Sequence, residues 1–235
     1  MIASDLSSMG FLFKNEVFTI TYKTLADSVE IEGGTKPRLV GYSEKLLLIG
    51  KGRSAFVFKI KGESLALKVY YPDKKRIALE EATIYRQLQH INYYPNLYDG
   101  GHNYIVIDYI EGNTLFQCLQ KGIYVPEKKF KEISKALKMA EDAGLNPADI
   151  HLKNIIMTLS EEVKVIDVAR FRQLEKDTQW KDIERAYYTL YSKMYFPKKM
   201  PTSILNLISF IYKKRYIPRN HSAFSLILPI SSSLF

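Results

Sequence analysis

The sequence predicts an α+β protein of two lobes, a small antiparallel sheet with one helix followed by a mainly helical second lobe. Residues 45–110 contain short β-type runs separated by glycine turns, whereas residues 126–213 carry apolar residues mostly at helical spacing. The chain has 235 residues, of which 46% are hydrophobic. That amount of apolar side chain supports one compact unit with a sizeable core.

The first lobe is expected to follow an N-terminal extension. Residues 11–31 alternate and are rich in Phe, Thr, Val and Ile, so residues 1–34 are interpreted as strands or a hairpin that ends at Gly33 and Gly34. Asp73 is predicted to cap a helix that bears Glu81 on its apolar side. Strands are expected before and after this helix, at Lys45–Ile49, Ala55–Lys61, Leu65–Tyr71, Asn96–Tyr98 and Tyr104–Ile110.

The second lobe is predicted to begin near Gly112, which gives a first lobe of residues 35–111 and a second of residues 112–235. Pro126 suits a first helical turn, and Gly144 suits a C-terminal cap with positive φ, so a helix is expected between them. A short hairpin and two further helices are then expected, at Ile155–Met157 with Val163–Ile166, at Trp180–Met194 and at Ile204–Lys213.

Composition limits the classes of protein that fit. The single cysteine, Cys118, excludes an internal disulfide and indicates a reducing compartment. Residues 1–10 do not resemble a signal peptide, and polar residues interrupt every long apolar stretch, so we expect a cytoplasmic protein without a membrane span. The formal charge of +9 is interpreted as solvated helix faces of the second lobe, with nucleic acid or another acidic partner as the alternative.

A glycine pattern lies between the first two strands of the predicted sheet. Gly50, Lys51 and Gly52 precede Ala55 and Val57, and glycines at such a turn let backbone N–H groups approach phosphate closely. Taken alone, two glycines in a β-turn are more typical of an ordinary turn. The strand–turn–strand setting argues against a dinucleotide site, which requires a helix after the glycines.

Lys68 is a charged residue in an otherwise apolar strand. A buried ammonium needs a carboxylate, and Glu81 shares a helix face with Ile84, Tyr85 and Leu88 that is directed toward the sheet. We therefore predict a Lys68–Glu81 pair. The alternative is that Lys68 faces solvent on the open side of the sheet.

Two aspartates and an asparagine follow the glycine-capped helix. Asp149 and Asn154 lie in a polar loop, and Asp167 ends the apolar run Val163–Ile166. Asp167 and Asn154 offer oxygen ligands for a hard cation, while Asp149 is available to accept a proton from an attacking hydroxyl. Each residue alone is more often a turn former.

The spacing of these residues carries a family resemblance. Asp149 to Asn154 read D-x-x-x-x-N, and Asp167 follows thirteen positions later, which resembles the protein kinase superfamily. Gly50–Val57 resembles its glycine-rich loop, Ala66–Lys68 its strand Ala-x-Lys, and Ile107–Gly112 its hinge. Over about residues 45–194, the resemblance implies a two-lobed kinase-like fold with a truncated helical lobe.

The resemblance also implies ATP and Mg²⁺ as cofactors. Asp149 would be the base, Asn154 and Asp167 the Mg²⁺ ligands, and Lys68 with Glu81 the phosphate clamp; His151 is a further catalytic candidate. The implied nucleotide contacts are Gly50, Lys51, Gly52, Ala55, Val57, Ala66, Lys68, Ile107, Asp108 and Ile110. The expected activity is transfer of the ATP γ-phosphate to a hydroxyl, with a Ser/Thr protein kinase as the first hypothesis.

Departures from the family pattern leave two alternatives to a Ser/Thr protein kinase open. His151 gives D-x-H-x-x-N, a form found among kinases of small molecules, and the segment after Asp167 is short. A sugar or aminoglycoside-like kinase is therefore the second hypothesis. The third is a nucleotide-binding pseudokinase or scaffold, since Ala55 replaces the third loop glycine and Asp167-Val168-Ala169 replaces Asp-Phe-Gly. Asp182 is hypothesised to tie the following helix to the catalytic loop.

Overall fold

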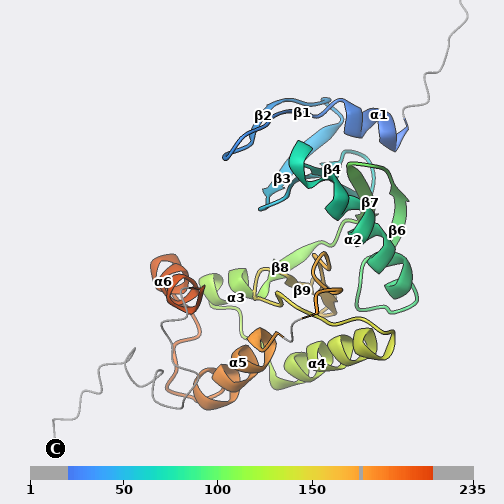
Figure 1. Ribbon diagram of the computed structural model, residues 1–235. Coiled ribbons are helices and arrows are strands. Elements are labelled where there is room, and N and C mark those ends of the chain that lie inside the picture. Colours follow the sequence, from blue (N-terminus) through green and yellow to red (C-terminus); the bar gives the residue numbers. More distant parts are fainter. Residues whose placement is uncertain (1–20, 175–176, 214–235) are drawn as a thin grey trace, which may run out of the picture.

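The computed structural model describes residues 21–174 and 177–213, which form two lobes (Figure 1). The N-lobe is built on a five-stranded antiparallel sheet in the order β3-β4-β5-β7-β6. Its strands are β3 (Leu46–Lys51), β4 (Ala55–Ile60), β5 (Leu65–Tyr70), β6 (Leu97–Gly100) and β7 (Tyr104–Asp108). All five strands predicted for this lobe are present, with bounds shifted by one or two residues in most cases.

The two faces of this sheet are covered by different elements. Helix α2 (Lys75–Leu88) shares a core with Ala55, Ala66 and Ile107. The opposite face, which includes Phe58 and Leu67, packs against α1 (Tyr22–Asp27) and the hairpin of β1 (Glu30–Glu32) and β2 (Arg38–Gly41). This division follows from the alternation of side chains along each strand.

The N-terminal extension differs from the prediction. Residues 11–20 of the expected strands lie outside the described residues, and residues 22–27 form helix α1 rather than a strand. Thr21 caps this helix, since its hydroxyl accepts a hydrogen bond from the backbone of Thr24. The hairpin exists, but Gly33 and Gly34 lie in its turn, and its second strand is β2.

The start of α2 also corrects a prediction. Asp73 does not cap the helix, because it lies within a 3₁₀ turn, Pro72–Lys74, and the helix begins at Lys75 without a side-chain cap. Helix α2 nevertheless presents the predicted apolar face. Glu81, Ile84 and Tyr85 are buried on it, whereas Glu80 is exposed.

The C-lobe combines a small antiparallel sheet with helices. The predicted hairpin of β9 and β10 is present, and β8 joins it in the order β10-β9-β8. The remaining bounds are β8 (Gly112–Thr114), β9 (Ile155–Thr158), β10 (Val163–Val165), α3 (Leu115–Lys121), α4 (Glu127–Asp142), α5 (Gln179–Ala186), a π-helical turn (Tyr187–Tyr191) and α6 (Thr202–Lys213). No helix among the described residues is long and apolar enough to cross a bilayer.

Helix α4 ends as predicted, and its start agrees within one position. Pro126 precedes it, and Gly144 follows it with a φ of +81°. Strand β8 and helix α3 were not predicted, although Thr114 and Gln117 form a capping box at the start of α3.

Two local contacts secure the C-lobe sheet. The buried ammonium of Lys129 on α4 donates to both carboxylate oxygens of Glu132, at 3.1 and 3.0 Å, and to the backbone carbonyl of Glu161 in the β9–β10 turn. At the lobe boundary, a Cβ added to Gly112 would collide with the backbone of Met157 and Thr158 on β9. Glycine at position 112 therefore permits the close approach of β8 to β9.

Candidate active site

A buried ammonium stands at the centre of the candidate site. Lys68 Nζ donates to Glu81 Oε1 and Oε2 at 3.0 and 2.8 Å, and to Asp167 Oδ1 at 3.0 Å. Glu81 is fully buried and also accepts a hydrogen bond from the hydroxyl of Tyr70. All three ammonium hydrogens of Lys68 therefore have carboxylate partners, and the predicted Lys68–Glu81 pair is present.

The electrostatics of this cluster favour the charged forms of Lys68 and Asp167, whereas burial raises the pKa of Glu81. Burial alone would lower the pKa of Lys68, but the carboxylates of Glu81 and Asp167 outweigh that effect and raise it. The Lys68 ammonium, in turn, lowers the pKa of Asp167 despite the opposing effect of burial. Lys68 and Asp167 are thus charged together at neutral pH.

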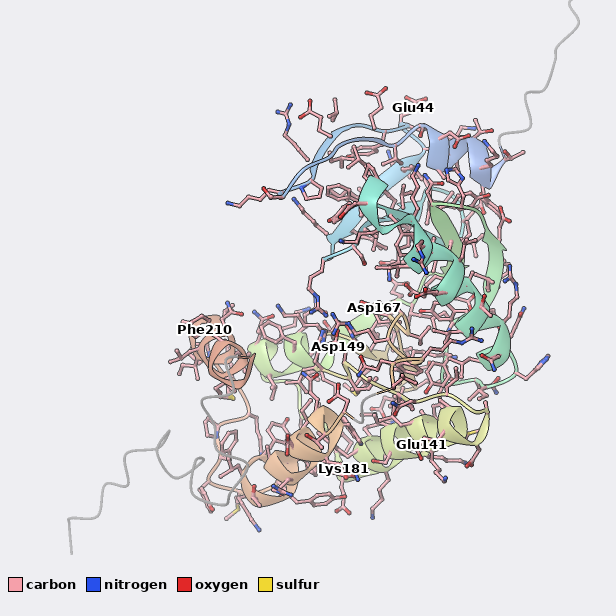
Figure 2. The ribbon with its side chains drawn as sticks, in the orientation of Figure 1. Glu44, Glu141, Asp149, Asp167, Lys181 and Phe210 are labelled. Carbon is pink, nitrogen blue, oxygen red and sulfur yellow. The ribbon has the colours of Figure 1, made fainter. Side chains whose placement is uncertain are left out.

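Asp167 is held from two sides. It follows the buried strand β10, and its backbone N–H donates to the hydroxyl of Tyr85 on α2 at 3.2 Å. Its φ of +60° is left-handed, as is the φ of +59° at Asp149. Such values cost about 1–2 kcal/mol for residues other than glycine, and cluster at functional sites. Figure 2 shows both labelled aspartates on the side of the C-lobe that faces the N-lobe.

The loop that carries Asp149 is closed by Asn154. The Asn154 side-chain amide donates to the backbone carbonyl of Asp149 at 3.1 Å, and its backbone N–H donates to the carbonyl of His151 at 2.8 Å. His151 lies within this loop, and burial lowers the pKa of its imidazole. Its Nδ1 is buried and has no hydrogen-bond partner among the residues that the structure describes.

Three residues without a predicted role also contact Asp149. Its Oδ2 forms an ion pair with Arg53 of the β3–β4 turn, and a second with Arg170 Nε at 3.5 Å. Its backbone N–H donates to Asp177 Oδ2 at 2.6 Å. Asp182 was hypothesised to tie α5 to this loop. The contact with the Asp149 N–H comes from Asp177, just before α5.

Most of the expected nucleotide contacts lie on four adjacent strands, β3, β4, β5 and β7. Val57 on β4 is opposite Lys68 on β5, and Ala66 on β5 is opposite Ile107 on β7. Cross-strand partners share a face, so these four side chains lie on the same side of the sheet as α2. Gly50 and Ala55 belong to β3 and β4, and Gly52 closes the turn between them by donating to Ala55 O at 2.9 Å.

Three expected nucleotide contacts need separate comment. The Lys51 ammonium turns away from this face and donates to the carbonyl of Pro37 at 2.8 Å. The Asp108 carboxylate accepts from Asn96 and from the Tyr98 hydroxyl, and the Asp108 backbone N–H donates to the carbonyl of Asn96 at 3.2 Å. Ile110 follows β7 in the connection to β8 and is partly buried.

The donor set suits a hard cation that is shared with another ligand. Among the described residues, no cluster of three or more His, Cys, Asp or Glu side chains is arranged to hold a metal ion. Asp167 keeps its second oxygen free of Lys68, and Asn154 adds an amide. Mg²⁺ is often bound by one or two protein oxygens together with substrate phosphates, so the residues present fit that cation.

Sequence signals existed for some of the missed residues. Tyr70 lies two positions after Lys68 on the same strand face, and Tyr85 lies four positions after Glu81 on the same helix face. Arg53 lies in the glycine pattern, but nothing in the sequence aims it at Asp149.

Comparison with known proteins agrees with this geometry. Residues 43–197 match the model of the protein kinase domain family. The chain is 46% identical over 180 residues to "Putative serine/threonine-protein kinase YrzF" of Bacillus subtilis. The aligned region covers 76% of this chain and 84% of that protein. It is 30% identical over 153 residues to a "Probable serine/threonine-protein kinase" of Clostridium perfringens, covering 57% of this chain and 22% of the relative.

Proposed function

We propose that this chain, which belongs to the protein kinase domain family, transfers the γ-phosphate of ATP to serine or threonine hydroxyls of proteins. The observation that carries the proposal is the ammonium of Lys68, held at once by Glu81 and Asp167. A fixed ammonium beside a half-exposed carboxylate suits a triphosphate with its cation. The names of the similar proteins from Bacillus and Clostridium support serine or threonine as the acceptor.

In the proposed mechanism, Lys68 binds the α- and β-phosphates of ATP while Glu81 holds its position. Glu81 already engages two of the three ammonium hydrogens, so a phosphate oxygen would take over the third from Asp167. Asp167 and Asn154 would hold Mg²⁺, which supplies positive charge to the phosphates. The backbone of the Gly50–Val57 turn would cover the phosphates from the N-lobe.

Asp149 is the proposed base. The acceptor hydroxyl oxygen forms a bond to the γ-phosphorus, the bond from that phosphorus to the bridging oxygen of ADP breaks, and the hydroxyl proton passes to the Asp149 carboxylate. Asn154 holds the loop through the Asp149 carbonyl, and Asp177 holds it through the Asp149 N–H. These two contacts fix the backbone of the base from both sides.

Labelling experiments test the proposed acceptor. The purified chain is incubated with MgATP labelled at the γ-phosphate, together with generic proteins or with sugars and aminoglycosides, and the products are identified by mass spectrometry. The proposal predicts phosphoserine or phosphothreonine in protein. Label found only in a small molecule would favour the second hypothesis, a sugar or aminoglycoside-like kinase, which His151 suggests. Nucleotide binding without any transfer would favour a pseudokinase.

A further inference from the structure

Two arginines from separate parts of the fold converge on the proposed base. Arg53 lies at the β3–β4 turn of the N-lobe, and Arg170 lies in the C-lobe segment after Asp167. Both bind the same carboxylate oxygen, Asp149 Oδ2, through Arg53 Nη2 and through Arg170 Nε at 3.5 Å. The proposed mechanism leaves both arginines without a role.

Two guanidinium groups share one carboxylate oxygen of Asp149. The nearby Asp177 carboxylate accepts from the Asp149 backbone N–H, and Asp167 pairs with Lys68. The arginine side chains are 65% and 53% exposed, while that of Asp149 is 21% exposed. Two exposed guanidinium groups therefore lie between the carboxylate and solvent, where an acceptor would approach.

An acceptor hydroxyl must reach the carboxylate that the arginines contact. A neutral acceptor that displaces them leaves two guanidinium groups without a charged partner. An acceptor that carries its own anion replaces the partner that they lose, because the planar guanidinium fork matches both carboxylate and phosphate oxygens. The arginines then exchange their charge-assisted contact with Asp149 for one with the anion of the acceptor.

We propose that Arg53 and Arg170 recognise an anionic group, a carboxylate or a phosphate, beside the hydroxyl that is phosphorylated. The acceptor class is then a serine or threonine segment that is acidic or already phosphorylated. The inference rests on the proposed function and extends it to the choice of substrate. Arg53 and Arg170 act as specificity-determining residues, since they select the acceptor and take no part in the proton transfer.

Matched peptides test this inference by steady-state kinetics. A library of serine and threonine peptides carries Glu, phosphoserine or Gln at each position beside the acceptor. We expect kcat/KM to be about tenfold higher with the anionic residue than with Gln, the scale of a charge-assisted hydrogen bond. The variant Arg53→Gln/Arg170→Gln should lose this preference. Arg38→Gln is the control, since exposed Arg38 pairs with Glu32 in the N-terminal hairpin.

Three kinetic results would overturn the inference. They are equal kcat/KM for anionic and neutral peptides, a preference that survives in the double variant, and a rise in the KM for ATP with unchanged peptide kinetics. The last result would assign the arginines to the nucleotide. The ratio of kcat/KM for phosphoserine peptides to kcat/KM for Glu peptides shows whether the preferred anion is a phosphate or a carboxylate.

A binding measurement separates this inference from the proposed function. Fluorescence anisotropy of the labelled peptides on the full chain requires no turnover. If binding depends on charge, and the double variant abolishes that dependence, the anion site stands even where no peptide is phosphorylated. If peptides are phosphorylated but the peptide charge affects neither binding nor turnover, the result supports the kinase function and contradicts the anion site.

Discussion

Replacing Glu81 with glutamine removes the negative charge that holds Lys68 inside the N-lobe. Glutamine keeps the size of the side chain and still accepts from Tyr70, so the change acts mainly on the ion pair. Lys68 is only 8% exposed and retains a single carboxylate, that of Asp167. The buried ammonium thus loses its main counterion, and the fold is destabilised.

The size of this effect follows from the burial of the pair. Removing one partner of a buried ion pair costs about 3–5 kcal/mol, and the remaining contact with Asp167 places Glu81→Gln at the lower end. A loss of about 3 kcal/mol lowers Tm by roughly 6–12 °C in a domain of this size. Glu80→Gln is the matched control, because Glu80 is exposed on the same helix, and its effect should stay within about 0.5 kcal/mol.

Urea unfolding followed by circular dichroism measures both variants, and a double variant tests the cause. Lys68→Met/Glu81→Gln removes the buried ammonium as well, so it should recover at least about 1 kcal/mol relative to Glu81→Gln alone. Two results would refute the reasoning: a Glu81→Gln variant as stable as Glu80→Gln, or a double variant that is less stable than the single one.

Two further substitutions test contacts of the C-lobe. Lys129→Ala removes the ammonium that joins α4 to the β9–β10 turn and should reduce the free energy of unfolding by about 1–3 kcal/mol, against about 0.5 kcal/mol or less for exposed Lys128→Ala. Equal losses in urea unfolding would contradict this. Gly112→Ala forces a methyl group against β9 and should cost at least about 2 kcal/mol, whereas Gly33→Ala, with no atom within 4 Å of the added Cβ, should be nearly silent in thermal unfolding. Identical melting temperatures for Gly112→Ala and Gly33→Ala would contradict this reasoning and show that β8 and β9 separate readily.

The parts of the site that follow from local rules were predictable. Lys68 required a carboxylate because its strand is apolar, and the helical face of α2 directed Glu81 inward. The hairpin that precedes Asp167 and the glycine cap of α4 were likewise readable from local residue patterns. In each case, the residues that decide the structure lie close together in the sequence or on one element.

Contacts set by the meeting of distant loops were not predictable in this way. Arg53 and Asp149 are separated by 96 positions, and their pairing depends on how the β3–β4 turn approaches the C-lobe. Asp177 lies 28 positions after Asp149 and reaches it only because the intervening segment turns back. Helix α1 departs from the prediction for a different reason, since Thr21 caps a short helix within a segment whose residues alternate as in a strand.

The most direct test of the account is the phosphotransfer rate of Asp149→Asn. Asparagine keeps the shape of the side chain but cannot serve as the base, so kcat with MgATP and a protein acceptor should fall by about 10²- to 10⁴-fold. Asp142→Asn serves as the control, because Asp142 is an exposed carboxylate that pairs with Lys138 on α4. An Asp149→Asn variant with the turnover of the Asp142→Asn control would contradict the account.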